Sequence, residues 1–245
     1  MRKAMIFAAG LGTRLKPLTD DKPKALVKLA GKTLLQRTIE KLIKTGVTYI
    51  VINIHHFPEL MRKAIDKLDY PGIEFIISDE STRLYDTGGG LLKAAKHLDG
   101  THPFIVHNVD IVSNINLNLM YEQHLKNDAL VSLAVSSRQS TRYFLWHENR
   151  LCGWKNIQTG NQITCYPTSE PPVAKAFSGI HIINPEIFGL IHETGKFSIN
   201  QLYLRLANSH NIIPYSHNPD LWADVGTTEK HAHANQMIVK NPENF

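Results

Sequence analysis

A segment near the N-terminus, FAAGLGTRLKPLTDDKPKAL, combines flexible backbone with several positive charges. Gly10 and Gly12 lie two residues apart, and Arg14 and Lys24 follow them. Glycine lets backbone N–H groups approach phosphate oxygens, while arginine supplies a fork of donors and lysine a movable charge. Leu15 stands where a dinucleotide-binding fingerprint needs glycine or alanine, and no Walker pattern is present. The residues alone leave two interpretations open, a tight turn with solvated charges and a phosphate-binding loop.

A second glycine-rich stretch, DTGGG at 86–90, opens a helical pattern. Three glycines at a helix start cost backbone entropy. A chain tolerates that cost where a flat ligand must approach the backbone closely, or where the turn needs a positive φ. A nucleobase or a sugar ring suits the first explanation, and the residues alone favour neither.

Asp110 and Asp224 are carboxylates expected at the ends of strands. One or two carboxylates together with substrate phosphates are the usual way in which proteins hold Mg²⁺. Either aspartate taken alone is more simply explained as a helix cap or a turn residue. Together with a phosphate-binding loop, the pair predicts a magnesium site.

Short apolar runs alternate with helical patterns in the first half of the chain. The runs are apolar on both faces and read AMIFAA, YIVINI, IEFIIS, PFIVHN and ALVSLAV. Helical spacing of apolar residues occurs in TLLQRTIEKLIKTG, PELMRKAIDKL and GGGLLKAAKHL. This alternation predicts an α/β fold with a Rossmann-like, three-layer, mostly parallel sheet. Ligands bind such sheets beyond the carboxyl ends of the strands, which is where both glycine-rich segments and both aspartates are expected.

The pattern changes after about residue 138. RYFLWHENRLCGWKN places turn residues between two aromatic-rich runs, which predicts an antiparallel hairpin. FSINQLYLRLA is expected to begin a helix with a capping box made by Ser198 and Gln201. No linker or repeat divides the chain, so we expect one domain over 1–245. Its first part covers about 1–137, and its second part, 138–245, holds a small antiparallel lid and the closing helices.

The composition limits the class of partner. The 245 residues are 42% hydrophobic and 20% charged, with a net charge of +5, values typical of a soluble globular chain. The charge suits an anionic ligand, but no Lys/Arg-rich run marks a nucleic-acid surface. No apolar run approaches the roughly 20 residues of a membrane span. Cys152 and Cys165 are too few for a disulfide framework and are expected to be free thiols of a cytoplasmic protein.

Taken together, the motifs resemble the signature of the sugar-phosphate nucleotidyltransferases, also called nucleotide-sugar pyrophosphorylases. The likeness begins with AAGLGTRL, PLT and the Pro23-Lys24 pair, and continues through GKTLLQRTIEKLIKTGV, DTGGG, FSGIHIINP and WADVGT. It covers essentially the whole chain in order. The short uridylyltransferases of the family, which act on N-acetylmuramate 1-phosphate in cell-wall recycling, resemble the chain most closely. Mannose- and heptose-1-phosphate guanylyltransferases share many of the same motifs.

The resemblance implies a role for each matching position. The catalytic residues would be Arg14, Lys24 and Asp110. The ligands of Mg²⁺ would be Asp110 and Asp224. The nucleotide would be bound by Ala8, Ala9, Gly10, Gly12, Thr13, Arg14, Lys24, Thr87, Gly88 and Gly89. The sugar phosphate would be bound by Asn108, Ser178 and Gly179. The first part of the chain would thus hold the nucleotide, and the second part the sugar phosphate.

The implied reaction joins a nucleoside triphosphate, by preference UTP, to a sugar 1-phosphate and releases pyrophosphate. The same motifs leave open a mannose- or heptose-1-phosphate guanylyltransferase, a phosphocholine cytidylyltransferase, and a non-catalytic regulator that binds nucleotide sugars. The chain departs from the family at Val109, where glycine commonly precedes the metal-binding aspartate. A monomer or homodimer is expected. Acetyltransferase activity is not expected, because the hexapeptide repeats of longer relatives are missing.

Overall fold

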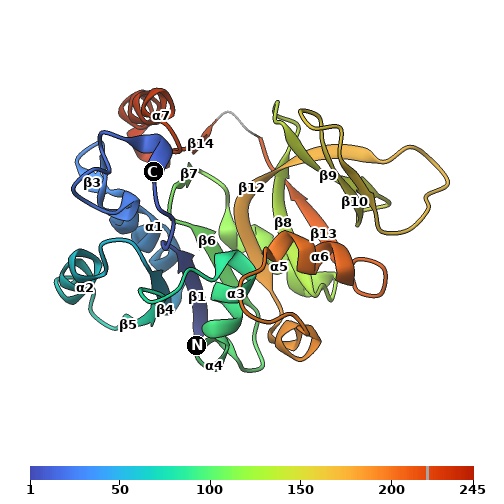
Figure 1. Ribbon diagram of the computed structural model, residues 1–245, viewed down its shortest axis with the longest axis horizontal. Helices are drawn as coiled ribbons and strands as arrows, with labels where there is room; N and C mark the ends of the chain where they lie inside the picture. The colour runs from blue at the N-terminus through green and yellow to red at the C-terminus, as the bar shows by residue number, and fades with distance from the viewer. Residues whose placement is uncertain (219–220) are drawn as a thin grey trace.

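A central β-sheet runs through the molecule in this computed structural model, which describes residues 1–218 and 221–245 (Figure 1). Its strands are β1 (Arg2–Phe7), β4 (Val47–Ile54), β5 (Glu74–Asp79), β6 (Phe104–Asn108), β8 (Val131–Ser136), β9 (Arg142–His147), β10 (Arg150–Asn156), β11 (Gln162–Thr164), β12 (Val173–Ile183) and β13 (Ile212–Ser216). Within the described ranges the sheet has ten strands, in the order β11-β10-β9-β12-β6-β1-β4-β5, with β8 joining β12 and β13 joining β8. Two short pairs lie outside it, β2 (Lys28–Leu29) with β3 (Lys32–Thr33) and β7 (Ile111–Ser113) with β14 (Trp222–Asp224).

The strands of the first half form the parallel part of this sheet. β1 pairs in parallel with β4 and β6, and β5 pairs in parallel with β4. In β4, Ile50, Val51 and Ile52 are fully buried, as a parallel sheet covered on both faces requires. The predicted α/β class with a mostly parallel central sheet is confirmed.

Helices cover both faces of the parallel part. They are α1 (Leu34–Ile43), α2 (Pro58–Asp66), α3 (Asp86–Lys93), α4 (Ala95–Leu98), α5 (Leu117–Lys126), α6 (Ile199–Leu206) and α7 (Thr228–Lys240). Apolar residues of α1, α2 and α7 share one core cluster with Ile50 and Ile52, whereas those of α3, α4 and α6 share another with Val51. The sheet is therefore the middle layer of three. In the described part of the chain, no helix combines the length and apolar character needed to cross a membrane.

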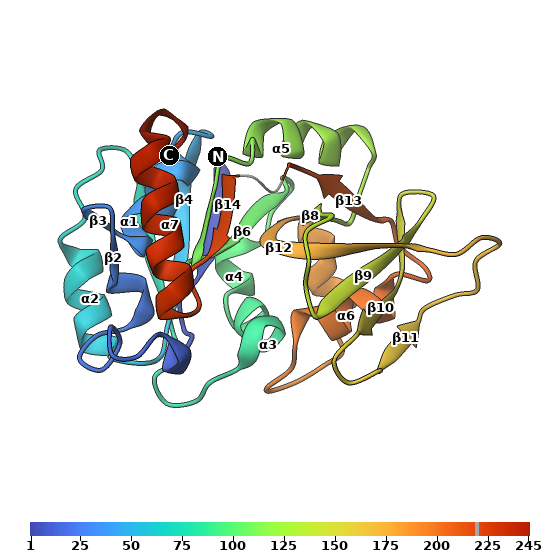
Figure 2. The same ribbon diagram turned by 90° about the horizontal axis from the view of Figure 1, so that it is seen from above.

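The second half continues the same sheet with antiparallel strands. β9 and β10 form the predicted hairpin, with Glu148 and Asn149 at positive φ, as a type I′ turn requires. One end of β12 pairs with β6 and the other with β9, so the antiparallel strands continue from the parallel ones. Figure 2 shows β9, β10 and β11 at the opposite end of the molecule from α1 and α2.

The two cysteines lie close together but remain reduced. The backbone N–H of Cys165 donates to the carbonyl of Cys152 at 2.8 Å, and the Cys152 thiol donates to the carbonyl of Leu145 at 3.2 Å. Both thiols are free, and burial raises the pKa of each. The expectation of free thiols is confirmed.

Helices α3 and α6 bring the two halves of the chain into contact at Gly88. The backbone N–H groups of Gly88 and Gly89 both donate to the carbonyl of Phe197, at 2.9 and 3.3 Å. A Cβ on Gly88 would lie 2.3 Å from the Phe197 ring, and a Cβ on Gly89 would lie 2.2 Å from the carbonyl oxygen of Gly195. Because neither glycine has a positive φ, the protein's own backbone accounts for this pair of glycines.

The start of α6 is capped from α3. Thr87 Oγ1 accepts a hydrogen bond from the backbone N–H of Ile199 at 3.0 Å. Ser198 Oγ accepts from the N–H of Asn200 at 3.3 Å. The predicted capping box of Ser198 with Gln201 is wrong, because the N–H of Gln201 donates to the carbonyl of Ser198 instead. A side chain from the first half supplies part of the cap that local sequence was expected to provide.

We expect Gly88→Ala to destabilise the fold by about 1–3 kcal/mol, the usual cost of overpacking. The added methyl group would collide with the Phe197 ring and approach its carbonyl oxygen to 3.0 Å. Gly189→Ala is the matched control, since no atom lies within 4 Å of a Cβ there. Urea unfolding should give a lower midpoint for the first variant and an unchanged midpoint for the second. Equal midpoints would contradict this prediction and would show that the Phe197 segment can shift to accept the added methyl group.

Candidate active site

A cavity of about 480 Å³ opens at the carboxyl edge of the parallel strands. Its walls come from the loop after β1, the end of β4, the segment between β5 and α3, and the turn after β6. The predicted nucleotide-binding residues that line it are Ala8, Ala9, Gly10, Gly12, Thr13, Arg14, Lys24 and Thr87. Asn108 and Asp110 line it as well. The fold thus brings most of the predicted first-half residues to one space.

The loop after β1 is held in shape by Gly12 and by the 3₁₀ turn η1 (Thr13–Leu15) that follows it. Gly12 has a φ of 67°, and a Cβ there would lie 3.1 Å from the side chain of Thr19. Thr19 Oγ1 donates to the carbonyl of Gly12 at 2.9 Å, and Leu15 is fully buried. These contacts fix the loop backbone while Arg14 remains exposed at the cavity.

Asn53 and Glu80 form a buried hydrogen-bond chain beneath this loop. Asn53 Oδ1 accepts from the backbone N–H groups of Ala8 and Ala9, at 2.6 and 3.2 Å. Asn53 Nδ2 donates to Glu80 Oε1 at 2.8 Å, and Glu80 Oε2 accepts from the N–H of Tyr85 at 3.2 Å. Glu80 is fully buried, and that burial raises the pKa of its carboxyl group.

Sequence reasoning missed several residues of this cavity, among them Asn53, Glu80 and Lys196. Asn53 was detectable, because it is a polar residue near the carboxyl end of the apolar run YIVINI. Glu80 was detectable in the same way, since it follows the next strand directly. Lys196 lines the cavity from the exposed segment before α6, and no local pattern distinguishes it from an ordinary surface lysine.

Lys24 and Asp110 meet at the cavity, with 2.5 Å between Nζ and Oδ2. Their side chains are 11% and 25% exposed, so water screens the pair only in part. Val109, the departure from the family pattern, is buried, and its N–H donates to the carbonyl of Phe7 at 3.1 Å. The valine joins the core, and Asp110 still reaches the cavity.

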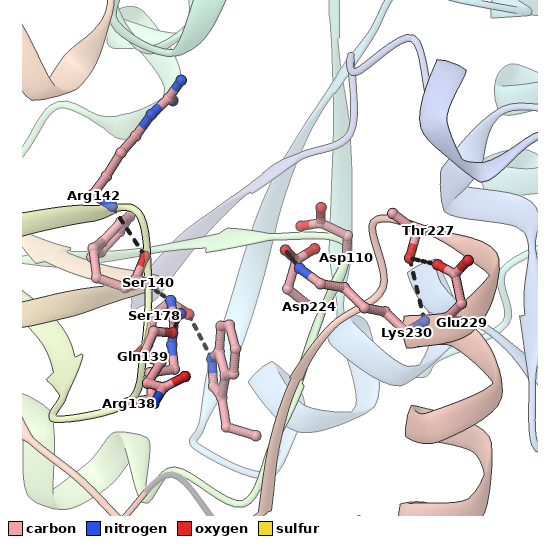
Figure 3. Close-up of polar contacts among 12 residues, drawn as sticks. Asp110, Arg138, Gln139, Ser140, Arg142, Ser178, Asp224, Thr227, Glu229 and Lys230 are labelled. Atoms are coloured by element: carbon pink, nitrogen blue, oxygen red, sulfur yellow. Dashed lines mark hydrogen bonds and ion pairs between the residues drawn. The ribbon is translucent and has the colours of Figure 1, made fainter. Parts of the chain in front are cut away.

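Asp224 lies next to Asp110 although the two are far apart in the sequence. Strands β7 and β14 pair in antiparallel fashion, and the N–H of Val225 donates to the carbonyl of Asp110 at 2.8 Å. Figure 3 shows the two aspartates as neighbours, with the Lys230 ammonium 2.9 Å from Asp224 Oδ2. The predicted pair of carboxylates is therefore brought together.

This donor set fits a hard divalent cation. Asp110, in the turn before β7, and Asp224, at the end of β14, offer carboxylate oxygens, and such oxygens are the ligands that Mg²⁺ takes. Lys24 and Lys230 each neutralise one of these carboxylates. Across residues 1–218 and 221–245, no group of three His, Cys, Asp or Glu side chains could hold a metal. A cation here would need substrate phosphates and water to complete its coordination.

The DTGGG segment contributes to the cavity through its first residues. Asp86 and Thr87 line the cavity, and Asp86 has a φ of 61°. Gly88 and Gly89 are buried and are not part of the lining. Their predicted contact with a base is replaced in this structure by the contact with the 195–197 segment.

Of the three residues predicted to bind the sugar phosphate, Asn108 lines the cavity and the other two do not. A Cβ on Gly179, whose φ is +77°, would lie 3.1 Å from Asn108 Nδ2, so Gly179 borders the residue that lines the cavity. Ser178 is fully buried, with Oγ 2.7 Å from His217 Nε2. The carbonyl of Ser178 accepts from Trp222 Nε1 at 3.0 Å. The Ser178 side chain is thus engaged inside the protein, and neither Ser178 nor Gly179 lines the cavity.

Comparison with known proteins agrees with this geometry. The family model described as "Nucleotidyl transferase" matches residues 3–241. N-acetylmuramate alpha-1-phosphate uridylyltransferase of Caulobacter vibrioides is 30% identical over 232 residues, which are 91% of each chain. Mannose-1-phosphate guanylyltransferase 1 of Arabidopsis thaliana is 27% identical over 91% of this chain and 61% of its own length. These likenesses confirm the resemblance inferred from the motifs.

A solved structure supports the fold. UDP-glucose pyrophosphorylase complexed with UDP-glucose superposes with a TM-score of 0.76 over 98% of this chain and 99% of that one. The two sequences are 21% identical, so this likeness concerns the architecture alone.

We expect Glu80→Gln to change how stability depends on pH. The pKa of Glu80 in the folded protein lies above the ordinary value of 4.5, so the native state holds that proton more tightly than the unfolded chain. As the pH rises from 4.5 towards the raised pKa, Glu80 therefore lowers the free energy of unfolding in the wild type. The glutamine keeps an acceptor for Asn53 and has no such loss.

Urea unfolding at several pH values between 4.5 and 7 measures this effect. The stability of the wild type minus that of Glu80→Gln should fall as the pH rises. Glu170→Gln, at an exposed position, is the control and should show no such trend. A stability difference for Glu80→Gln that stays constant with pH would contradict the assignment.

Proposed function

The chain belongs to the nucleotidyl transferase family, and we propose that it joins a nucleoside triphosphate to a sugar 1-phosphate, giving a nucleoside diphosphate sugar and pyrophosphate. One observation carries this proposal, the convergence of the glycine-rich loop, Arg14 and the Lys24–Asp110 pair on a single cavity. Asp224 lies alongside on the neighbouring strand. This set of groups suits a triphosphate and a divalent cation.

The similarity to the two relatives supports a choice of substrates. The uridylyltransferase of Caulobacter vibrioides is 30% identical to this chain, and the guanylyltransferase of Arabidopsis thaliana is 27% identical. We therefore propose UTP and N-acetylmuramate 1-phosphate as the substrates, in cytoplasmic recycling of cell-wall sugars. A guanylyltransferase acting on mannose 1-phosphate is the second candidate, because that relative covers 91% of this chain.

Different groups of this chain bind different phosphates of the nucleoside triphosphate. Backbone N–H groups of the loop from Ala8 to Thr13, together with Arg14, bind the phosphates that leave as pyrophosphate. Lys24 lies between the loop and Asp110 and balances charge on the α-phosphate, where the bond forms and breaks. Such a reaction is accelerated mainly by positioning and by stabilisation of developing charge.

A general base is not required. The attacking group is an oxygen of the sugar phosphate, which is already anionic at neutral pH. The difficulty is repulsion between two anions, and cations at the cavity answer it. Mg²⁺, when held by Asp110 and Asp224, would add positive charge at the phosphates and help to orient them.

A pyrophosphate-release screen of nucleoside triphosphates against sugar 1-phosphates tests the proposed function. We expect the highest turnover with UTP and N-acetylmuramate 1-phosphate. Lys24→Met should lower kcat/KM for the same pair about 100- to 1,000-fold, the usual cost of removing one group that stabilises transition-state charge.

Lys22→Met is the matched control, because Lys22 forms an ion pair with Asp21 and does not line the cavity. Its activity should stay near that of the wild type. Highest turnover with GTP would move the assignment to the guanylyltransferases. No pyrophosphate with any pair, from a folded protein, would leave a binding role instead.

A shared metal ion predicts that the losses from Asp110→Asn and Asp224→Asn do not multiply. Each substitution alone should nearly abolish turnover at saturating Mg²⁺. The double variant should lose little more, because the second change acts on a site that has already lost its ion. Steady-state rates of the three variants across a Mg²⁺ titration measure this coupling.

Glu229→Gln is the control for the change in charge. Glu229 lies near Asp224 in Figure 3, and its carboxylate accepts from the Thr227 hydroxyl at 2.9 Å. This variant should keep both its rate and its Mg²⁺ dependence. Losses for the two aspartates that multiply as independent factors would rule out a shared ion.

A further inference from the structure

Arg138 is a cation outside the cavity that the proposed function has not used. It follows strand β8, and its guanidinium carbon lies 4.0 Å from the centre of the Trp222 ring. Arg138 Nη2 donates to the carbonyl of Phe177 at 2.7 Å. Trp222 is itself fixed, because its Nε1 donates to the carbonyl of Ser178 at 3.0 Å. The guanidinium is thus held against an aromatic ring on one side.

One donor of this guanidinium is left without an acceptor. Arg138 Nε is buried, and among the described residues it has no hydrogen-bond partner. Nη1 donates to the carbonyl of Gln139 at 3.4 Å, a long hydrogen bond. A buried donor without a partner costs free energy, more so when it carries charge. A ligand that supplies anionic oxygens would satisfy it.

The position of Arg138 places such a ligand beside the metal carboxylates. Trp222 and Asp224 are two residues apart on β14, and alternate residues of a strand project to the same face. The Asp224 carboxylate is close enough to oppose the effect of burial on the pKa of Arg138. Figure 3 shows Arg138 and Ser178 on one side of the Asp110–Asp224 pair, and Lys230 on the other.

Each of the other cations near these carboxylates either lines the cavity or is paired with a carboxylate. Arg14, Lys24 and Lys196 line the cavity that we assign to the triphosphate. Lys230 is paired with Asp224. Arg138 does not line that cavity, and Figure 3 shows it near Ser178. Gly179, which follows Ser178 in the chain, borders Asn108 at the cavity. Arg138 is therefore placed where the second anionic substrate would enter.

We propose that Arg138, held on Trp222, binds the 1-phosphate group of the sugar substrate. The proposal rests on the proposed function. An arginine fork can bind two phosphate oxygens at once, which leaves a third free to attack the α-phosphate. Stacking on Trp222 fixes the plane of the fork before the substrate arrives, so less order is lost on binding. Trp222 is then a positioning residue.

The test compares Arg138→Met and Arg138→Lys with Arg142→Met. Arg142 is an exposed arginine nearby, and its side chain points away from Arg138 in Figure 3. Arg138→Met should raise KM for the sugar 1-phosphate about 10- to 100-fold, as expected for losing a charged hydrogen bond. KM for the nucleoside triphosphate should change less than about twofold. Arg138→Lys should lie between, and Arg142→Met should match the wild type.

A comparison of a neutral with an acidic sugar 1-phosphate shows whether Arg138 binds the phosphate or another anionic group of the substrate. The rise in KM should be similar for glucose 1-phosphate and for N-acetylmuramate 1-phosphate, provided that each is turned over. A rise confined to the acidic sugar would overturn the assignment and indicate a contact with its carboxylate. Unchanged KM values in Arg138→Met, with wild-type turnover intact, would overturn the proposal while leaving the proposed function in place.

If the wild type turns over no pair of substrates, a binding measurement still tests the contact between Arg138 and the phosphate group. The Arg138 Nε–H resonance of ¹⁵N-labelled protein, identified by its loss in Arg138→Lys, is followed during titration with glucose 1-phosphate. We expect a saturable shift that free glucose does not produce. A resonance that does not move with glucose 1-phosphate would refute the contact, whatever the fate of the proposed function.

Discussion

The geometry of the loop after β1 depends on one buried contact, the hydrogen bond from Asn53 Nδ2 to the Glu80 carboxyl group. Burying a carboxyl group is costly unless it is hydrogen-bonded, and here the second oxygen is used as well, by the N–H of Tyr85. With its amide oriented in this way, Asn53 has an oxygen available for Ala8 and Ala9. The loop after β1 and the loop after β5 are thus fixed by the same pair. Gly90 is part of this arrangement, since a Cβ there would lie 2.7 Å from Glu80 Oε1.

The side of the cavity that carries Asp110 and Asp224 follows a different electrostatic rule. Asp110 lies in the turn before β7, Asp224 ends the neighbouring strand β14, and each carboxylate is paired with a lysine. The lysines offset the repulsion that two close carboxylates would otherwise feel. A divalent cation would take over part of that task, which would leave the Lys24 ammonium available to phosphate oxygens. Charge balance at this edge can therefore be kept both with and without substrate, which suits a site that must exchange highly charged ligands.

The sequence predicted best those features that depend on strand order and local pattern. The glycine-rich loop, Lys24, Asp110 and Asp224 all follow from the rule that ligands bind at the carboxyl ends of parallel strands. Gly88 and Gly89 show the limit of that rule, because a close approach by the 195–197 segment before α6 and a close approach by a ligand require the same residue type. Ser178 shows another limit. Its partner His217 lies on a distant segment, and a single sequence does not report that contact.

Arg138 was beyond sequence reasoning for a related reason. Its proposed role depends on Trp222, a residue far along the chain, and on a donor that has no partner among residues 1–218 and 221–245. Asn53 and Glu80 were within reach, because each is a polar residue at the end of an apolar strand. Contacts made through the end of a strand can be inferred from order along the chain. Contacts between side chains of the antiparallel part require the packing itself.

Strand β12 connects the two sides of the site. Its first residues pair with β9 and its last with β6, and its register against β8 shifts between Phe177 and His181. Gly179 lies within that shift at positive φ, against Ile111 and Asn108. A side chain there would push the sugar side away from the turn that carries Asp110. The separation between the loop after β1, which we propose binds the triphosphate, and the place proposed for the sugar phosphate is consequently set by continuous strand geometry. An in-line displacement needs such a fixed separation, because misplacement of the attacking oxygen by about 1 Å costs roughly 100-fold in rate.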